Sequence, residues 1–164
     1  MRILVFLQGT ILMHSRAVGR SREERAAQSR SGSDQSVRDS ATHVPVGNAV
    51  AKLNRLRDQG ATILYLTLNR DPAKVAQDVA ILRRFGFPDG SVLARGPGES
   101  HGDVAGRELL DLLIEDDCKS IGADEITHPQ LSPERRVRIK SIIVPEFGGI
   151  DRLPDSLTEL LALD

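Results

Sequence analysis

The chain begins with a run of apolar residues that ends on a Gly-Thr step, MRILVFLQGT at residues 1–10. The run shows no alternation of apolar and polar positions, which is typical of a strand buried on both faces of a parallel sheet. Ligands of open α/β sheets bind just beyond the carboxyl ends of such strands. Gly9 lets the backbone turn sharply, and the Thr10 hydroxyl can donate or accept a hydrogen bond there. We therefore expect a ligand site at the end of this first strand.

Further apolar runs alternate with segments of helical spacing along the rest of the chain. Strands are predicted at 61–66, 91–95 and 141–144, and a fourth directly before the acidic residues at 115–117. Helices are predicted between them, for example over 46–59, where Gly60 provides the stop. This order predicts an α/β fold, a three-layer parallel sheet with helices on both faces, formed by one domain over residues 1–164.

Composition limits the classes of partner and compartment. With 22 basic and 23 acidic residues the formal net charge is -1, so nothing draws the whole chain toward nucleic acid or an anionic membrane. No apolar run approaches the roughly 20 residues needed to span a bilayer. The single cysteine, Cys118, excludes an intrachain disulfide, and the carboxylates before it disfavour a nucleophilic thiol. We expect a soluble, cytoplasmic protein that binds neither nucleic acid nor membrane.

Residues 15–43 differ in composition from the rest. The segment holds six Arg and many Ser, and Val18 and Val37 are its only large aliphatic residues. Such a segment buries too little apolar surface to offset its ordering entropy, which predicts a mobile or partly ordered loop. The alternative interpretation is a small lid over the sheet end that offers arginines to an anionic ligand, namely Arg16, Arg20, Arg22 and Arg25.

The second predicted strand ends on Thr67-Leu68-Asn69-Arg70 and is followed by Asp71-Pro72, an N-cap and a first helical residue. The free amides of such a junction attract anions. Thr67 is therefore a candidate for ligand binding. Asn69 is either its neighbour in that role or a plain turn residue.

Three consecutive carboxylates, Glu115, Asp116 and Asp117, follow the apolar residues at 112–114. Their mutual repulsion is costly unless a cation, arginines or amide donors lie nearby. Clustered oxygen ligands suit Mg²⁺, which prefers one or two carboxylates together with water and phosphate oxygens. The alternative is that the three carboxylates cap the next turn or pair with Arg70 or Arg95.

The first strand end also resembles the first motif of the haloacid dehalogenase (HAD) superfamily, Asp-x-Asp-Gly-Thr, with FLQGT at 6–10 in that register. In the family the first Asp is the nucleophile that forms an aspartyl-phosphate, and the second is the general acid/base. This chain has Phe6 and Gln8 at those positions, and neither can do that chemistry. The resemblance implies a HAD-like fold without the aspartyl-phosphate mechanism.

Two later segments extend the resemblance. The run ILYLTLNR at 63–70 is similar to the second motif, in which Ser or Thr holds the transferring phosphoryl group, and Thr67 matches that residue. DLLIEDD at 111–117 is similar to the fourth motif, whose acidic residues hold the metal. Asp116 aligns best there, with Glu115 and Asp117 behind it.

Other family features are altered in this chain. The family usually places a Lys before the fourth motif, but none occurs between Lys74 and Lys119, where Arg95 or His101 could substitute. A short similarity to the deoxyribonucleotidase branch covers VLAR and the later LLIEDD. In the family a cap follows the first motif, so 15–43 would be a reduced cap. The loop at 145–154 is expected to return toward the sheet end, without an assigned role.

The sequence supports three functional interpretations. The first is a HAD-like domain that has lost catalysis but keeps its pocket, and binds a phosphorylated small molecule or a protein partner. The second is a nucleotidase-like, metal-dependent phosphohydrolase that activates water through a cation at 115–117. The third is a structural or oligomerising domain. The first is our prediction, with phosphate-binding residues Gly9, Thr10, Thr67, Asn69 and Arg95, and Mg²⁺ ligands Asp116, Glu115 and Asp117.

Overall fold

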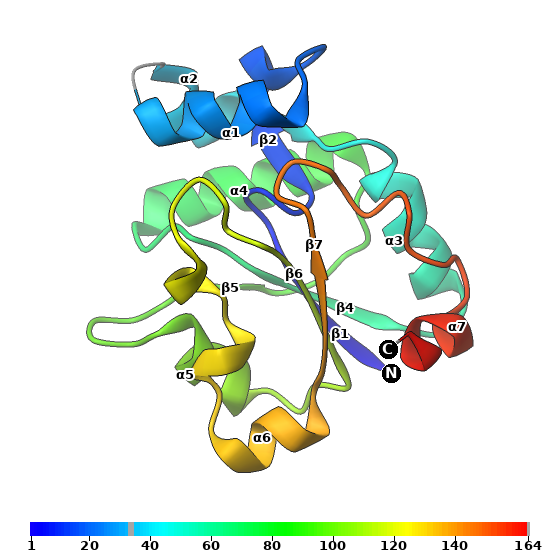
Figure 1. Cartoon of the computed structure of the whole chain (residues 1–164). Helices are drawn as coiled ribbons and strands as arrows, with labels where there is room; N and C mark the ends of the chain where they lie inside the picture. The colour runs from blue at the N-terminus through cyan, green and yellow to red at the C-terminus, as the bar shows by residue number, and fades with distance from the viewer. Residues whose placement is uncertain (33–34, 164) are drawn as a thin grey trace.

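The computed structural model describes residues 1–32 and 35–163, and its centre is a five-stranded parallel sheet (Figure 1). The strands follow the order β5-β4-β1-β6-β7. Their bounds are β1 (Arg2–Phe6), β4 (Thr62–Leu66), β5 (Val92–Leu93), β6 (Leu112–Asp116) and β7 (Lys140–Val144). The first strand is central, with Val5 in register with Tyr65 on one side and Ile114 on the other. All five carboxyl ends therefore lie along one edge of the sheet.

Both faces of the sheet are covered by helices, as the unalternating strands predicted. On one face, α3 (Ala49–Asp58), α4 (Pro72–Phe85) and α7 (Leu157–Ala162) pack around Ile3 and Val5. On the other face, α5 (His101–Arg107) and the segment after α6 (Pro133–Arg138) pack around Leu4 and Phe6. The three-layer α/β fold is confirmed.

Helix termini follow local sequence signals closely. The Asp71 side chain accepts a hydrogen bond from the Ala73 amide at 2.9 Å, and Pro72 is the first residue of α4. Ser100 and Asp103 form a reciprocal capping box at the start of α5. The strand predicted at 91–95 is shorter, since β5 contains only two residues. Two short 3₁₀ turns, η3 (Ala123–Glu125) and η4 (His128–Gln130), link β6 to α6.

The polar segment 15–43 lies across the carboxyl ends of the strands, at the top of Figure 1. It is largely helical where described, with η1 (Ser15–Ala17), α1 (Arg22–Ser31), α2 (Gln35–Arg38) and η2 (Ser40–Thr42), rather than a loop. An antiparallel pair, β2 (Leu12–His14) and β3 (His43–Pro45), joins it to the body of the molecule. We call the segment from 15 to 42 the insert.

The loop after β7 returns to the end of β1, as expected. The Phe147 amide donates a hydrogen bond to the Gly9 carbonyl at 2.7 Å. This contact brings residues 145–149 beside the first strand end and beneath the insert. Within the described residues, no helix is both long and apolar enough to cross a membrane.

Candidate functional site

Three carboxylates meet at the carboxyl end of the sheet. Asp116, Asp117 and Glu146 each place an oxygen within 4.8 Å of the other two. We call them the carboxylate group. Asp116 and Asp117 come from the end of β6, while Glu146 comes from the loop after β7. The sequence predicted the first two but not Glu146, because it is distant in the chain and lies in a loop without a motif.

Asp116 is held in place by hydrogen bonds from both ends of its carboxylate. The Thr10 hydroxyl donates to Oδ2 at 2.8 Å, and the Cys118 amide donates to Oδ1 at 2.9 Å. Gly9 is essential to this arrangement: its φ is +87°, and a Cβ there would lie 2.7 Å from Asp116 Oδ2. The Gly-Thr step at the end of β1 therefore positions Asp116: Gly9 leaves space for its carboxylate, and Thr10 donates a hydrogen bond to it.

Asp116 and Glu146 are buried and Asp117 is partly exposed, and the three like charges alter the acidity of Asp116. Burial raises the pKa of Asp116 to about 7, and the charges of Glu146 and Asp117 add to that effect. The hydrogen bonds from Thr10 and Cys118 oppose it. Burial also raises the pKa of the Cys118 thiol, with Asp116 as the next cause, in agreement with a structural cysteine.

The insert is tied to this group by arginine. Arg22 Nη2 donates to Asp117 Oδ2 at 2.6 Å, and Arg22 Nε donates to the Glu146 carbonyl at 3.0 Å. Arg25 donates to the Phe147 carbonyl at 2.8 Å. The arginine pairing that the sequence suggested for the carboxylates thus exists, but through Arg22 and not through Arg70 or Arg95.

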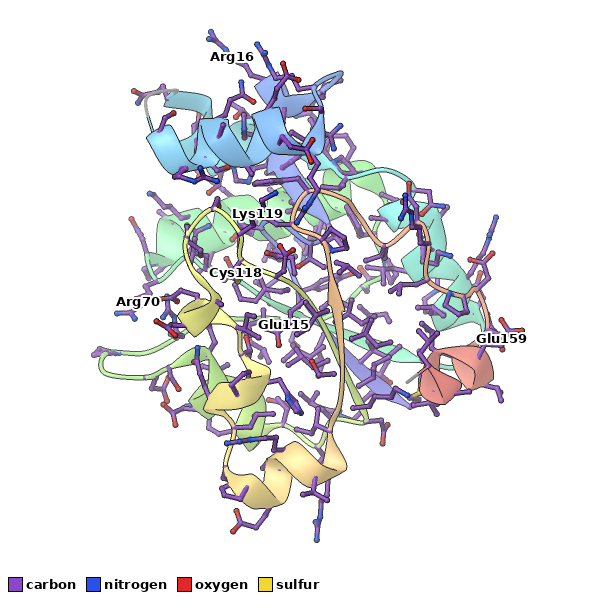
Figure 2. All side chains as sticks on the ribbon, viewed as in Figure 1. Arg16, Arg70, Glu115, Cys118, Lys119 and Glu159 are labelled. Carbon is purple, nitrogen blue, oxygen red and sulfur yellow. The ribbon has the colours of Figure 1, made fainter. Side chains whose placement is uncertain are left out.

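Arg16 and Arg20 are the other two arginines of the lid interpretation. Arg20 Nε donates to the Arg16 carbonyl. In Figure 2, Arg16 projects from the outer side of the insert, away from the sheet. Arg22 and Arg25, both from α1, reach the loop after β7.

Glu115 lies apart from the carboxylate group. It accepts hydrogen bonds from the Thr127 amide at 2.6 Å and the His128 amide at 3.0 Å. Successive side chains of a strand point to opposite faces, so Glu115 and Asp116 cannot share one small site. In Figure 2, Glu115 is farther from the insert than Cys118 and Lys119 are. Burial raises its pKa.

A second polar cluster surrounds Asp78, a fully buried residue of α4. Thr67 Oγ1 donates to Asp78 Oδ2 at 2.6 Å, and Asn69 Nδ2 donates to the same oxygen at 2.8 Å. Gln8 Nε2 donates to Asp78 Oδ1 at 3.2 Å, and its side-chain oxygen accepts from the Leu68 amide at 2.9 Å. The side chains of Gln8, Thr67 and Asn69 are therefore engaged with a carboxylate of the chain itself.

Sequence reasoning missed Asp78, although a signal was present. Val75, Val79 and Leu82 define the apolar face of the predicted helix, and Asp78 falls on that face. A carboxylate on an inward-facing position needs donors around it. The polar residues at the ends of the first two strands were the available donors.

Phe6 and Arg95 both lie beside His101, next to the first strand end. The Phe6 ring packs edge-on against His101, with centroids 5.0 Å apart. Burial lowers the pKa of His101 to about 4, and the nearby Arg95 lowers it further. Arg95 is half-buried beside His101, so the structure does not bring it together with Gly9 and Thr10.

A cavity of about 140 Å³ lies between the sheet end and the insert. Its lining includes Phe6 and Gln8 from the first strand end, and Asp116 and Glu146 from the carboxylate group. The candidate site is thus a small cavity with carboxylates at its margin.

The donor set of the carboxylate group fits a hard divalent cation. All three side chains offer oxygen, and a cluster of like charges with two buried members is stabilised by a cation between them. Two of the predicted ligands, Asp116 and Asp117, belong to this set. Glu115, the third, lies outside the group, and Glu146 is its third member.

The burial of His101 predicts a measurable pH dependence. Its folded pKa of about 4 lies below the ordinary value of 6.5, so the unfolded chain binds the proton first. The free energy of unfolding is therefore highest above pH 6.5, where His101 is neutral in both states, and it falls as the pH drops toward 4. We expect a loss of about 2–3 kcal/mol between pH 7 and about pH 4.5, measured by urea unfolding. His101→Leu should remove this component, and an unchanged pH slope in the variant would contradict the assignment.

Comparisons with known proteins bear on the fold. No family model and no curated protein sequence matches this chain. The class C acid phosphatase of Bacillus anthracis matches with a TM-score of 0.56 at 16% identity, over 98% of this chain and 77% of that chain. The same enzyme with tungstate bound matches with a TM-score of 0.56 at 20% identity, over 90% and 68%.

A chain of a Pnkp1/Rnl/Hen1 complex also matches, with a TM-score of 0.52 at 13% identity over 88% of this chain. This chain spans about half, 46%, of that one. Identities of 20% or less establish the fold alone. The chain shares the α/β fold of this class C acid phosphatase, which agrees with the fold that the resemblance of its first strand end implied.

Proposed function

We propose that this chain is a HAD-like domain that binds Mg²⁺ at Asp116, Asp117 and Glu146 and has lost aspartyl-phosphate chemistry. The observation that carries the proposal is the carboxylate group itself. Its members lie within 4.8 Å of one another, beside a strand end that offers Phe6 and Gln8 instead of carboxylates. The site keeps the charge needed for a cation but not the nucleophile.

The loss of catalysis is supported by how Phe6 and Gln8 are used. Phe6 is buried and packs against His101. Gln8 uses its amide to donate to Asp78 and to accept from Leu68. General acid/base help alone is worth roughly 10²–10⁴ in rate, and the covalent nucleophile is missing as well. Binding without rapid turnover is the expected behaviour.

A phosphorylated ligand would reach this site only with the cation. Asp78 and the carboxylate group place four carboxylates around the sheet end, which disfavours an anion. Bound Mg²⁺ would supply the positive charge that lets a phosphate group approach. In this proposal Thr10 orients Asp116 and Gly9 leaves room for it. Thr67 and Asn69 fix the end of β4 to α4 through their hydrogen bonds to Asp78.

The test is Mg²⁺ binding by the full chain. We expect Glu146→Gln to weaken Mg²⁺ binding at least about tenfold in titration calorimetry, because it removes a ligand of a hard cation. Glu115→Gln is the matched control: it neutralises a buried glutamate of the same strand end that lies outside the carboxylate group, and should leave the affinity unchanged. Failure of the unaltered chain to bind Mg²⁺ would contradict the proposal and favour a structural role.

A second measurement separates binding from catalysis. A panel of phosphate monoesters is expected to show no Mg²⁺-dependent hydrolysis by the unaltered chain. Hydrolysis that disappears in Asp116→Ala would instead establish the metal-dependent phosphohydrolase alternative.

A further inference from the structure

The cavity beneath the insert is mainly apolar although it touches the carboxylate group. Phe6, Met13 and Leu68 line it from the body of the molecule, Val37 lines it from the insert, and Phe147 from the loop after β7. Its volume of about 140 Å³ is close to that of an apolar cavity that holds one benzene ring, roughly 150 Å³. The space therefore suits one aromatic ring.

The charges around the cavity restrict what the ring can carry. Among the described residues that line it, none is Lys or Arg, and Asp116 and Glu146 are both present. An anionic group is tolerated only where a cation covers these carboxylates. The part of a ligand that enters the cavity is therefore not anionic, and the apolar lining favours an uncharged group over a charged one.

His43 provides an independent indication that a ligand belongs here. It lines the cavity and is 6% exposed, and its Nδ1 has no hydrogen-bond partner among the described residues. A buried polar atom without a partner is uncommon in folded proteins and is costly. Burial lowers the pKa of His43, so the neutral imidazole offers a donor or an acceptor to a ligand atom.

We propose that the ligand of this site is a phosphate monoester of an aromatic alcohol. Its phosphate group lies at the cation held by the carboxylate group, and its uncharged ring lies between Phe6, Leu68 and Phe147. A polar atom of the ring meets His43 Nδ1. This inference rests on the proposed Mg²⁺ site and adds the chemical class of the ligand.

The first experiment compares phenyl phosphate with inorganic phosphate, each in the presence of Mg²⁺. We expect phenyl phosphate to bind at least about tenfold more tightly in titration calorimetry, because its ring leaves water for an apolar space. Leu68→Asp should reduce this advantage, while Leu109→Asp, at an exposed position outside the cavity lining, should not. Equal affinity for the two anions would overturn the inference.

The position of the ring can be read directly, since the chain has two methionines. Met13 lines the cavity, whereas Met1 precedes β1 at the opposite end of the sheet. In a protein carrying ¹³C-methyl methionine, phenyl phosphate with Mg²⁺ should shift the Met13 signal and leave Met1 unchanged. Inorganic phosphate with Mg²⁺ is the control for effects of the anion alone. An unshifted Met13 signal on saturation would overturn the placement.

Hydroxyphenyl phosphates test the contact with His43. At least one isomer is expected to bind more tightly than phenyl phosphate, and to lose that advantage in His43→Phe. If no isomer gains affinity, the assignment of His43 is wrong. If Mg²⁺ binds but phenyl phosphate gains nothing over inorganic phosphate, only the ligand class fails. If Mg²⁺ itself does not bind, the proposed function fails together with the inference.

Discussion

Replacing Asp78 with alanine is expected to lower the free energy of unfolding by about 3–5 kcal/mol. The fully buried carboxylate accepts hydrogen bonds from Gln8, Thr67 and Asn69, and its removal takes away the charged acceptor that all three share. The acceptors that remain are neutral hydroxyl or amide oxygens at 3.1 to 3.4 Å. Hydrogen bonds to a charged group are among the strongest in a protein, and buried donors without a partner are costly. Urea unfolding monitored by circular dichroism measures the loss.

Gln77→Ala provides the control for this experiment, because Gln77 is exposed on the adjacent position of α4. It should change the free energy of unfolding by less than about 0.5 kcal/mol. Asp78→Asn keeps one acceptor oxygen, so its loss should lie between those of the other two variants. If Asp78→Ala is as stable as Gln77→Ala, Asp78 does not organise the two strand ends.

Asp116→Asn should have opposite effects on stability and on metal binding. The folded pKa of Asp116 is about 7 against an ordinary 3.8, so the unfolded chain ionises first as the pH rises. The metal-free protein therefore loses stability between pH 4 and pH 7, and by pH 8 the loss amounts to about 2–4 kcal/mol. The neutral amide avoids that cost. We expect the variant to be more stable than the unaltered chain at pH 8 without metal.

The same substitution should abolish stabilisation by Mg²⁺, because an anionic ligand of the cation has been removed. Unfolding measured at pH 5 and pH 8, with and without Mg²⁺, gives both results in one series. Asp124→Asn, at an exposed position, should leave the pH profile and the Mg²⁺ effect unchanged. An Asp116→Asn protein that Mg²⁺ still stabilises would exclude Asp116 from the metal site.

Much of the fold was predictable because its signals are local or periodic. The unalternating strands indicated a sheet covered on both faces, and helices alternate with strands along the chain. Asp71-Pro72 and the Ser100–Asp103 box fixed two helix starts, since a cap depends on residues only two or three positions apart. The insert was harder, because few apolar residues indicate its helices. Arg22 and Arg25 connect it to a loop more than a hundred residues away.

The sequence by itself determined that Phe6 and Gln8 stand at the end of the first strand, and neither side chain can act as a nucleophile or a general acid/base wherever it lies. It also placed Asp116 and Asp117 at a strand end. Only the tertiary structure brought Glu146 to them, turned Glu115 to the opposite face, and placed Asp78 beneath Gln8 and Thr67. These relations depend on loops and on packing between segments far apart in the chain. No local pattern encodes such contacts, because their geometry exists only once the sheet has formed.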